Sequence, residues 1–199
     1  MRNDLIRTFI AVETSDEVKR ELSEVLSRLG NLPFSIKWVE LDNVHLTLSF
    51  LGYVEKDKLN DLYQAVEDGS VGMSPFVIKP TRIVCFPSFK KPRVIVLGLK
   101  GEVFLLEKLQ KQIEKSLLKA GFQPKVKRSH LTLGRVRREI KRSDRLKLGR
   151  KLVNFPVDFK QVITVDSVAV FKSDLFPQGP VYTKLKEFKL SQSEPSLML

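Results

Sequence analysis

Apolar residues recur along the chain at two spacings, every second position in some segments and every third or fourth in others. The first spacing predicts strands, whose side chains alternate between two faces, and the second predicts helices that bury one face. Strands are predicted at residues 6–12, 37–39, 44–51, 76–86, 93–99, 129–136, 155–162, 165–171 and 181–190. Helices are predicted at residues 15–30, 59–69, 102–120 and 143–153, the first capped by Ser15 and the third ended by Gly121.

The order of these elements repeats: a strand and a helix followed by a pair of strands occur in the first half, and a similar order recurs in the second. This repetition predicts an α+β class with a duplicated two-lobed fold, in which two mostly antiparallel sheets face a central cleft and the helices lie outside. We expect residues 1–190 to form this single domain with an internal pseudo-repeat, and residues 191–199 to be a flexible tail.

Composition narrows the class of protein. Hydrophobic residues make up 42% of the 199 residues and charged residues 29%, which favours a folded core. The single cysteine, Cys85, cannot form an internal disulfide, and two histidines are too few for a Cys/His zinc cluster. No apolar stretch is long enough to cross a bilayer. We therefore expect a cytoplasmic monomer with no membrane partner.

Positive charge is concentrated in one segment. The formal net charge is +12, and residues 125–151 contain twelve Lys and Arg residues against two acidic ones. Such a block attracts polyanions, so nucleic acid is the leading candidate partner. A solvated basic face without a ligand is the alternative interpretation of the block.

Both histidines of the chain begin the same tetrapeptide, as His45-Leu46-Thr47-Leu48 and His130-Leu131-Thr132-Leu133. Because strand side chains alternate, the histidine and threonine of each copy share one face and the leucines pack on the other. Two such strands facing one cleft would offer two imidazoles for proton transfer and two hydroxyls for phosphate oxygens. The alternatives are half-buried strand histidines and a metal site made by both histidines with a carboxylate.

This pair of motifs resembles the two-histidine phosphoesterase superfamily and, within it, the RNA 2′,3′-cyclic phosphodiesterases, historically called 2′-5′ RNA ligases. The resemblance also covers the segments 7–12, 38–39, 49–52, 86–87, 92–94, 134–136, 171–173 and 179–182. It implies hydrolysis of a terminal ribose 2′,3′-cyclic phosphate to a 2′-phosphate, with possible reverse 2′-5′ ligation and with no metal or other cofactor.

The resemblance also implies roles for single residues. His45 and His130 would be the acid/base pair, with the acid assigned to His45 and water activation to His130. Thr47, Thr132 and Arg135 would bind the phosphate, and Phe9 would stack on the terminal base. Arg135 has the wrong strand parity to share a face with His130, so it reaches the phosphate only if Gly134 permits a bulge or the strand ends there.

The expected partner is RNA with a 2′,3′-cyclic phosphate end, including tRNA fragments. Its backbone would lie on cations of the basic block, namely Lys125, Lys127, Arg128, Arg137 and Arg138. Trp38 and Phe50 are further candidates for base stacking, although the parity of Phe50 favours the core. Two other functions stay open: a nucleic-acid-binding module without catalysis, and a phosphodiesterase for small cyclic nucleotides.

Overall fold

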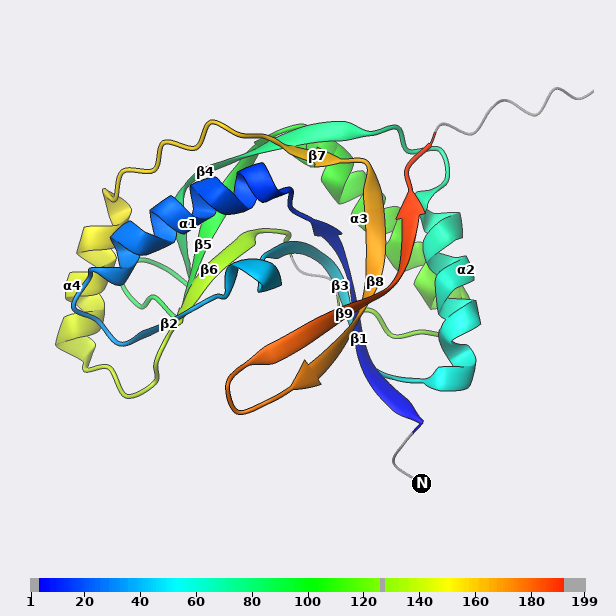
Figure 1. Cartoon of the computed structure of the whole chain (residues 1–199), viewed down its shortest axis with the longest axis horizontal. Coiled ribbons are helices and arrows are strands. Elements are labelled where there is room, and N and C mark those ends of the chain that lie inside the picture. Colours follow the sequence, from blue (N-terminus) through cyan, green and yellow to red (C-terminus); the bar gives the residue numbers. More distant parts are fainter. Residues whose placement is uncertain (1–3, 126–127, 192–199) are drawn as a thin grey trace, which may run out of the picture.

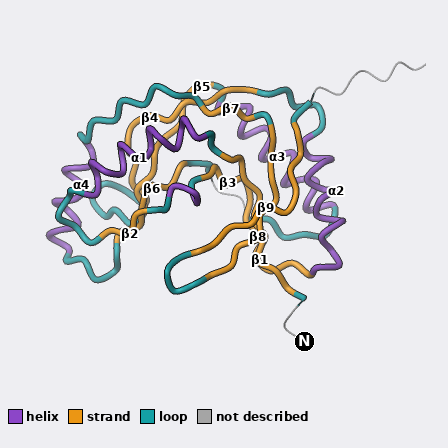
Figure 2. Tube along the Cα trace, in the orientation of Figure 1, coloured by secondary structure: helices purple, strands orange, loops and turns teal. Residues whose placement is uncertain are grey.

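A curved antiparallel sheet arches through the molecule, and the long helices lie on its outer side (Figure 1, Figure 2). The structure is a computed structural model that describes residues 4–125 and 128–191. The strands are β1 (Leu5–Glu13), β2 (Ile36–Trp38), β3 (His45–Glu55), β4 (Phe76–Phe86), β5 (Val94–Gly101), β6 (Leu131–Val136), β7 (Ile163–Val165), β8 (Ser167–Leu175) and β9 (Pro180–Lys189). The helices are α1 (Asp16–Gly30), α2 (Leu59–Ser70), α3 (Val103–Lys119) and α4 (Arg142–Val153), with short 3-10 turns η1 (Leu41–Asn43) and η2 (Lys56–Lys58).

The strand order is β7-β4-β5-β6-β3-β1-β8-β9, with β2 paired to the free part of β6. The α+β class and the antiparallel pairing confirm the prediction from the sequence. The two expected sheets are however connected, because β3 and β6 share one pair of residues, Leu46 and Leu131. One half of the sheet therefore contains β7, β4, β5, β6 and β2, and the other contains β3, β1, β8 and β9.

Helix burial follows the apolar spacing. The inward face of α1 is formed by Val18, Leu22, Val25 and Leu29, and the Ser15 hydroxyl caps it by accepting a hydrogen bond from Val18 N at 3.4 Å. The inward face of α3 is formed by Leu106, Leu109, Ile113 and Leu117, together with the polar Gln110. No helix in the described part of the chain has the length and apolar character needed to span a bilayer.

One predicted strand is wrong. Residues 155–162 are extended but pair with no strand, and they run along the outside of α1. The Glu21 carboxylate accepts hydrogen bonds from the backbone N–H groups of Lys160 and Gln161, and Arg28 donates to the Pro156 carbonyl at 3.0 Å. These contacts from α1 satisfy backbone groups that a neighbouring strand would otherwise pair. The strand begins instead at Ile163, where β7 pairs with β4.

Candidate active site

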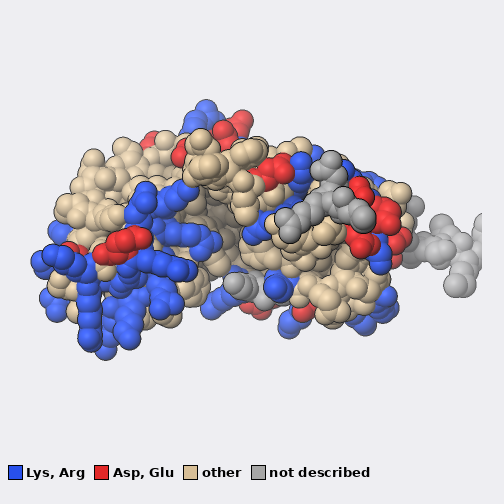
Figure 3. All heavy atoms as spheres, turned by 90° about the horizontal axis from the view of Figure 1, so that it is seen from below, with Lys and Arg blue, Asp and Glu red and all other residues tan. Residues whose placement is uncertain are grey.

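A cleft of about 1060 Å³ lies on the concave side of the sheet, between its two halves. Both histidines line it, and so do Thr47, Thr132 and Arg135. The sequence therefore identified residues that the fold brings together from opposite halves of the sheet. In the space-filling view the cleft is a hollow bordered by basic side chains (Figure 3).

The two motifs meet at the centre of the sheet. Leu46 and Leu131, each directly after a histidine, form the single pair that joins β3 to β6, and both are fully buried. The side chains on either side of each leucine point to the opposite face, which is the cleft. Ser129 strengthens the contact by donating a hydrogen bond from its hydroxyl to the Thr47 carbonyl at 3.0 Å.

Both motif strands contain a bulge at the same position, the second leucine of the tetrapeptide. In β3, Ala11 and Ile10 of β1 pair with Thr47 and Ser49, so Leu48 is skipped. In β6, Val96 and Ile95 of β5 pair with Thr132 and Gly134, so Leu133 is skipped. Each extra residue has a hydrogen-bonded carbonyl: Gln110 Nε2 donates to Leu48 O at 2.6 Å, and Val39 N donates to Leu133 O at 3.0 Å.

The bulges reverse the strand parity after each threonine. Arg135 therefore faces the cleft with His130 and Thr132, because of a bulge at Leu133, one residue before the position expected from the sequence. Phe50 occupies the equivalent place after the first motif. It lines the cleft, against the parity expected from the sequence, and also packs against the buried cluster of Phe9 and Phe171. Ser49 is turned away from the cleft and is 1% exposed.

His45 is held by aromatic rings and by a backbone carbonyl. Its Nδ1 lies 2.8 Å from the Asn43 carbonyl oxygen, which can only accept, so Nδ1 carries the hydrogen and Nε2 is the nitrogen that exchanges a proton. Phe9 lies 4.8 Å from the imidazole between ring centroids, and the Tyr182 ring meets it edge-on at 5.3 Å. The Phe9 ring is 3% exposed and is stacked on Phe171. Phe9 lines the cleft, but most of its ring packs against the imidazole and Phe171, and its role in base stacking stays a prediction.

His130 has the same backbone hydrogen bond in a different setting. Its Nδ1 lies 2.8 Å from the Arg128 carbonyl oxygen, so Nε2 is again the nitrogen that exchanges a proton. The Phe86 ring lies 5.3 Å from its imidazole between centroids. Arg128 also lines the cleft with its side chain.

The pKa of His45 is lowered to about 4, mainly by burial; the hydrogen bond to Asn43 opposes this change, and the charge of a protonated His130 adds to it. His45 is therefore neutral in the open cleft at neutral pH. Burial raises the pKa of Tyr182, and the nearby Arg7 and Arg135 guanidinium groups partly offset the rise. Both arginines thus lie close enough to act on the same end of the cleft.

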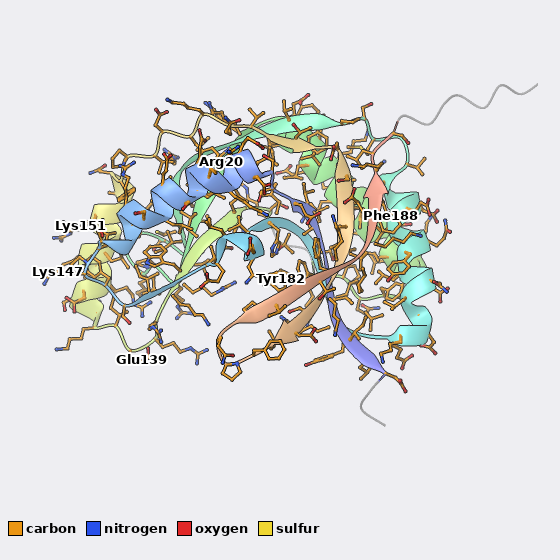
Figure 4. The ribbon with its side chains drawn as sticks, viewed as in Figure 1. Arg20, Glu139, Lys147, Lys151, Tyr182 and Phe188 are labelled. Carbon is orange, nitrogen blue, oxygen red and sulfur yellow. The ribbon has the colours of Figure 1, made fainter. Side chains whose placement is uncertain are left out.

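Several cleft residues were missed by the sequence reasoning. Arg7 on β1 lines the cleft, and its Nη1 donates a hydrogen bond to the Ser173 hydroxyl at 2.9 Å. Its strand parity with Phe9 was the signal that could have found it. Tyr182 faces the space between the halves of the sheet (Figure 4), and Lys37 reaches the cleft from β2. Neither has a local pattern that separates it from an ordinary surface residue.

The basic block is only partly at the cleft. Arg128 lines it, whereas Lys125, Arg137 and Arg138 are exposed outside it and Lys127 lies outside the described residues. Lys147 and Lys151 of α4 lie at the outer end of the molecule, away from Tyr182 (Figure 4). Lys and Arg nevertheless gather on the half of the molecular surface that carries α4 and extend to the hollow (Figure 3).

The described residues give less support to metal-dependent or thiol chemistry. No group of three His, Cys, Asp or Glu residues within 4–125 and 128–191 is placed to hold a metal ion. Burial raises the pKa of the Cys85 thiol to about 12, so Cys85 is not a thiolate nucleophile. The cleft presents imidazole, hydroxyl and guanidinium groups, together with the carboxylates of Glu40 and Asp42.

Comparison with known proteins identifies the family of the chain. Residues 12–96 and 102–182 match the family described as LigT like Phosphoesterase. The chain belongs to this family. It is 32% identical over 187 residues to the RNA 2′,3′-cyclic phosphodiesterase of Methanothermobacter thermautotrophicus, covering 93% of this chain and 99% of that protein. It is also 32% identical over 184 residues to the enzyme of the same name from Thermotoga maritima, covering 92% and 94%.

Solved LigT-like structures share the fold. TT0787 of Thermus thermophilus superposes with a TM-score of 0.71 at 27% identity, covering 93% of this chain and 98% of that one. Escherichia coli LigT complexed with 3′-AMP superposes with a TM-score of 0.70 at 23% identity, covering 96% and 100%. The predicted family and fold class are confirmed.

Proposed function

We propose that this LigT-like phosphoesterase hydrolyses the terminal 2′,3′-cyclic phosphate of RNA to a 2′-phosphate. The proposal is carried by one observation: His45 and His130 line a single cleft, and each is oriented by a backbone carbonyl so that Nε2 is its proton-exchanging nitrogen. An RNA substrate takes its support from the names of the relatives that match nearly the whole chain. It is also consistent with the cytoplasmic location expected from the sequence.

In the proposed reaction a water attacks phosphorus, the bond from phosphorus to the 3′ oxygen breaks, and the 2′ ester remains. His130 takes the proton of the water, and His45 donates a proton to the leaving 3′ oxygen. His45 is neutral before substrate binds, so it must gain its proton when the phosphate anion enters, because a nearby negative charge raises the pKa of an imidazole.

The phosphate oxygens are proposed to lie against Thr47, Thr132 and Arg135. Hydroxyl groups donate to phosphate without forming an ion pair, and a guanidinium group adds charge-assisted hydrogen bonds to developing negative charge. Arg7 also lines the cleft, and its side chain donates a hydrogen bond to Ser173. Attack by a 5′-hydroxyl of RNA in place of water on the same cyclic phosphate would form a 2′-5′ linkage, which is the ligase reaction of this proposal.

RNA leading to the cyclic end is proposed to cross Arg128 at the cleft and then the exposed Arg137 and Arg138. Contacts of this kind bind phosphates without reading sequence and weaken with salt. A tRNA fragment fits this scheme because the cleft requires only a cyclic 3′ end on a single strand.

The test is an assay in EDTA with an oligoribonucleotide that ends in 2′,3′-cyclic phosphate. We expect a 2′-phosphate product, and we expect His45→Ala and His130→Ala each to remove most of the rate. Binding of the oligomer without any product would identify the chain as a nucleic-acid-binding module. Equal or faster hydrolysis of a cyclic mononucleotide would identify a phosphodiesterase for small cyclic nucleotides.

A further inference from the structure

Two exposed aromatic side chains line the cleft without a role in the proposed proton transfer. Phe86 at the end of β4 is 37% exposed, and Phe176 in the turn between β8 and β9 is 53% exposed. Exposed rings in a basic cleft are typical of proteins that bind single-stranded nucleic acid, because unpaired bases stack on them. Their placement on opposite halves of the sheet suggests two separate bases.

A row of cross-strand pairs leads from Phe86 across the sheet to two cations. Phe86 pairs with Val94 of β5, Val94 pairs with Arg135 of β6, and Arg135 pairs with Lys37 of β2. Paired residues on neighbouring strands point to the same face, and all of these residues line the cleft. The row therefore runs from an aromatic ring to the ammonium group of Lys37.

The row continues into the β8–β9 turn. Lys37 Nζ donates to the Gln178 carbonyl at 3.3 Å, and Asn43 Nδ2 donates to the Pro180 carbonyl at 3.0 Å. Within the turn, Phe176 and Gly179 exchange backbone hydrogen bonds of 3.0 and 3.1 Å. The turn that carries Phe176 joins β8 to β9 and is hydrogen-bonded to Lys37 of β2, which belongs to the other half of the sheet.

The two rings relate to different histidines of the cleft. Phe86 is in ring contact with His130, so it borders the place where the proposed cyclic phosphate lies. On the other side, Tyr182 contacts His45 and pairs with Ser173, and Phe176 follows Ser173 by three residues. That step is roughly 10 Å along a strand. Phe176 thus lies beyond Tyr182 along the β8–β9 hairpin as counted from His45, and Lys37 contacts Gln178 of the same turn.

We propose that Phe86 stacks on the terminal base of the RNA, Phe176 stacks on the preceding base, and Lys37 binds the phosphate that joins the two nucleotides. This inference rests on the proposed function and makes it more specific. The substrate of the cleft is then an RNA end of at least two nucleotides, and a cyclic mononucleotide fills only part of the site.

The same turn supplies a matched control. Leu175 precedes Phe176 and is 63% exposed, but it does not line the cleft. Both side chains are exposed, so neither substitution to alanine removes a core contact. Thermal unfolding of each variant verifies that it folds as the wild type does.

The experiment compares kcat/KM for a cyclic mononucleotide and for a dinucleotide that ends in cyclic phosphate. We expect the dinucleotide to be the better substrate, Phe176→Ala to lower its kcat/KM about tenfold through lost stacking, and Leu175→Ala to leave it unchanged. For the mononucleotide, Phe176→Ala should have no effect, whereas Phe86→Ala should lower kcat/KM for both substrates. Phe176→Trp keeps an aromatic ring at this position and should retain the preference for the dinucleotide that Phe176→Ala loses.

A direct reading of stacking comes from 2-aminopurine, whose fluorescence falls when it stacks, placed at the terminal or the preceding position of a bound oligomer. We expect Phe176→Ala to restore the fluorescence of the preceding position alone. An unchanged preference in Phe176→Ala would overturn the inference and leave the turn as a surface for a protein partner. Loss of hydrolysis of both substrates in the wild type would instead refute the proposed function.

Discussion

The strands β3 and β6 carry the same tetrapeptide, the same bulge at its second leucine and the same hydrogen bond from His Nδ1 to the carbonyl two residues earlier. Their surroundings differ. His45 is enclosed by Phe9 and Tyr182, whereas His130 lies two residues after Arg128 and contacts Phe86. Local sequence therefore sets the direction of each imidazole, and the elements packed around His45 lower its pKa through burial.

The fifth residue after each histidine shows the same division. The bulge turns this residue into the cleft in both strands, but it is Phe50 in β3 and Arg135 in β6. One copy of a common backbone thus adds apolar surface to the cleft, and the other adds a cation. The two halves of the site therefore share a backbone geometry and differ in the side chains that they bring to the cleft.

The largest expected effect comes from removing either imidazole. His45→Ala and His130→Ala should each lower kcat on an RNA 2′,3′-cyclic phosphate by about a hundredfold to ten-thousandfold, because each removes one partner in proton transfer. Steady-state assays with both variants measure the effect. A loss below about threefold in either one would mean that the two strands do not share the chemistry.

The next effect tests the fifth position. Arg135→Ala should lower kcat/KM about a hundredfold, because it removes a charged donor to the phosphate in the transition state. Arg137→Ala is the matched control, since this arginine is exposed outside the cleft, and it should leave the rate on a cyclic mononucleotide unchanged. Equal losses of kcat/KM in the two variants would mean that Arg135 acts only by general electrostatic attraction of the substrate.

A smaller effect tests the bulge of β3. Gln110→Leu removes the donor to the Leu48 carbonyl in a buried place, so we expect a loss of about 1–3 kcal/mol in unfolding free energy. Gln112→Leu on the same helix is the control, because Gln112 Oε1 is buried without a hydrogen-bond partner in the described residues and nothing is lost with it. Urea unfolding of both variants gives the comparison, and equal stabilities would exclude a special role for the bulge contact.

The smallest effect separates the two imidazoles by their protons. His45, with its pKa lowered to about 4 by burial, is neutral at pH 6 and should take up a proton when an anion binds beside it. Sulfate is a suitable probe because its charge is constant in this range, and its affinity should rise as pH falls from 6 toward 4. Calorimetry in two buffers of different ionisation enthalpy measures the uptake, which His45→Ala should abolish. Proton uptake that persists in His45→Ala would indicate that His130, and not His45, is the acid.

Much of the fold followed from local pattern. Apolar spacing located the four helices, and Ser15 and Gly121 marked their ends, because caps and buried faces depend on residues close together in sequence. The false strand at 155–162 shows the limit of this reasoning. Its backbone groups are bonded by Glu21 and Arg28 of α1, more than a hundred residues earlier in the chain.

The sequence by itself determined the chemistry of the site: two copies of a histidine and a threonine that alternation places on one strand face. Tertiary structure decided which other residues join them, since the bulges at Leu48 and Leu133 reverse the parity on which strand prediction depends. It also enclosed Phe9 and brought Lys37 to the β8–β9 turn. A residue type fixes what a group can do, but pKa and reach depend on neighbours that only the folded chain supplies.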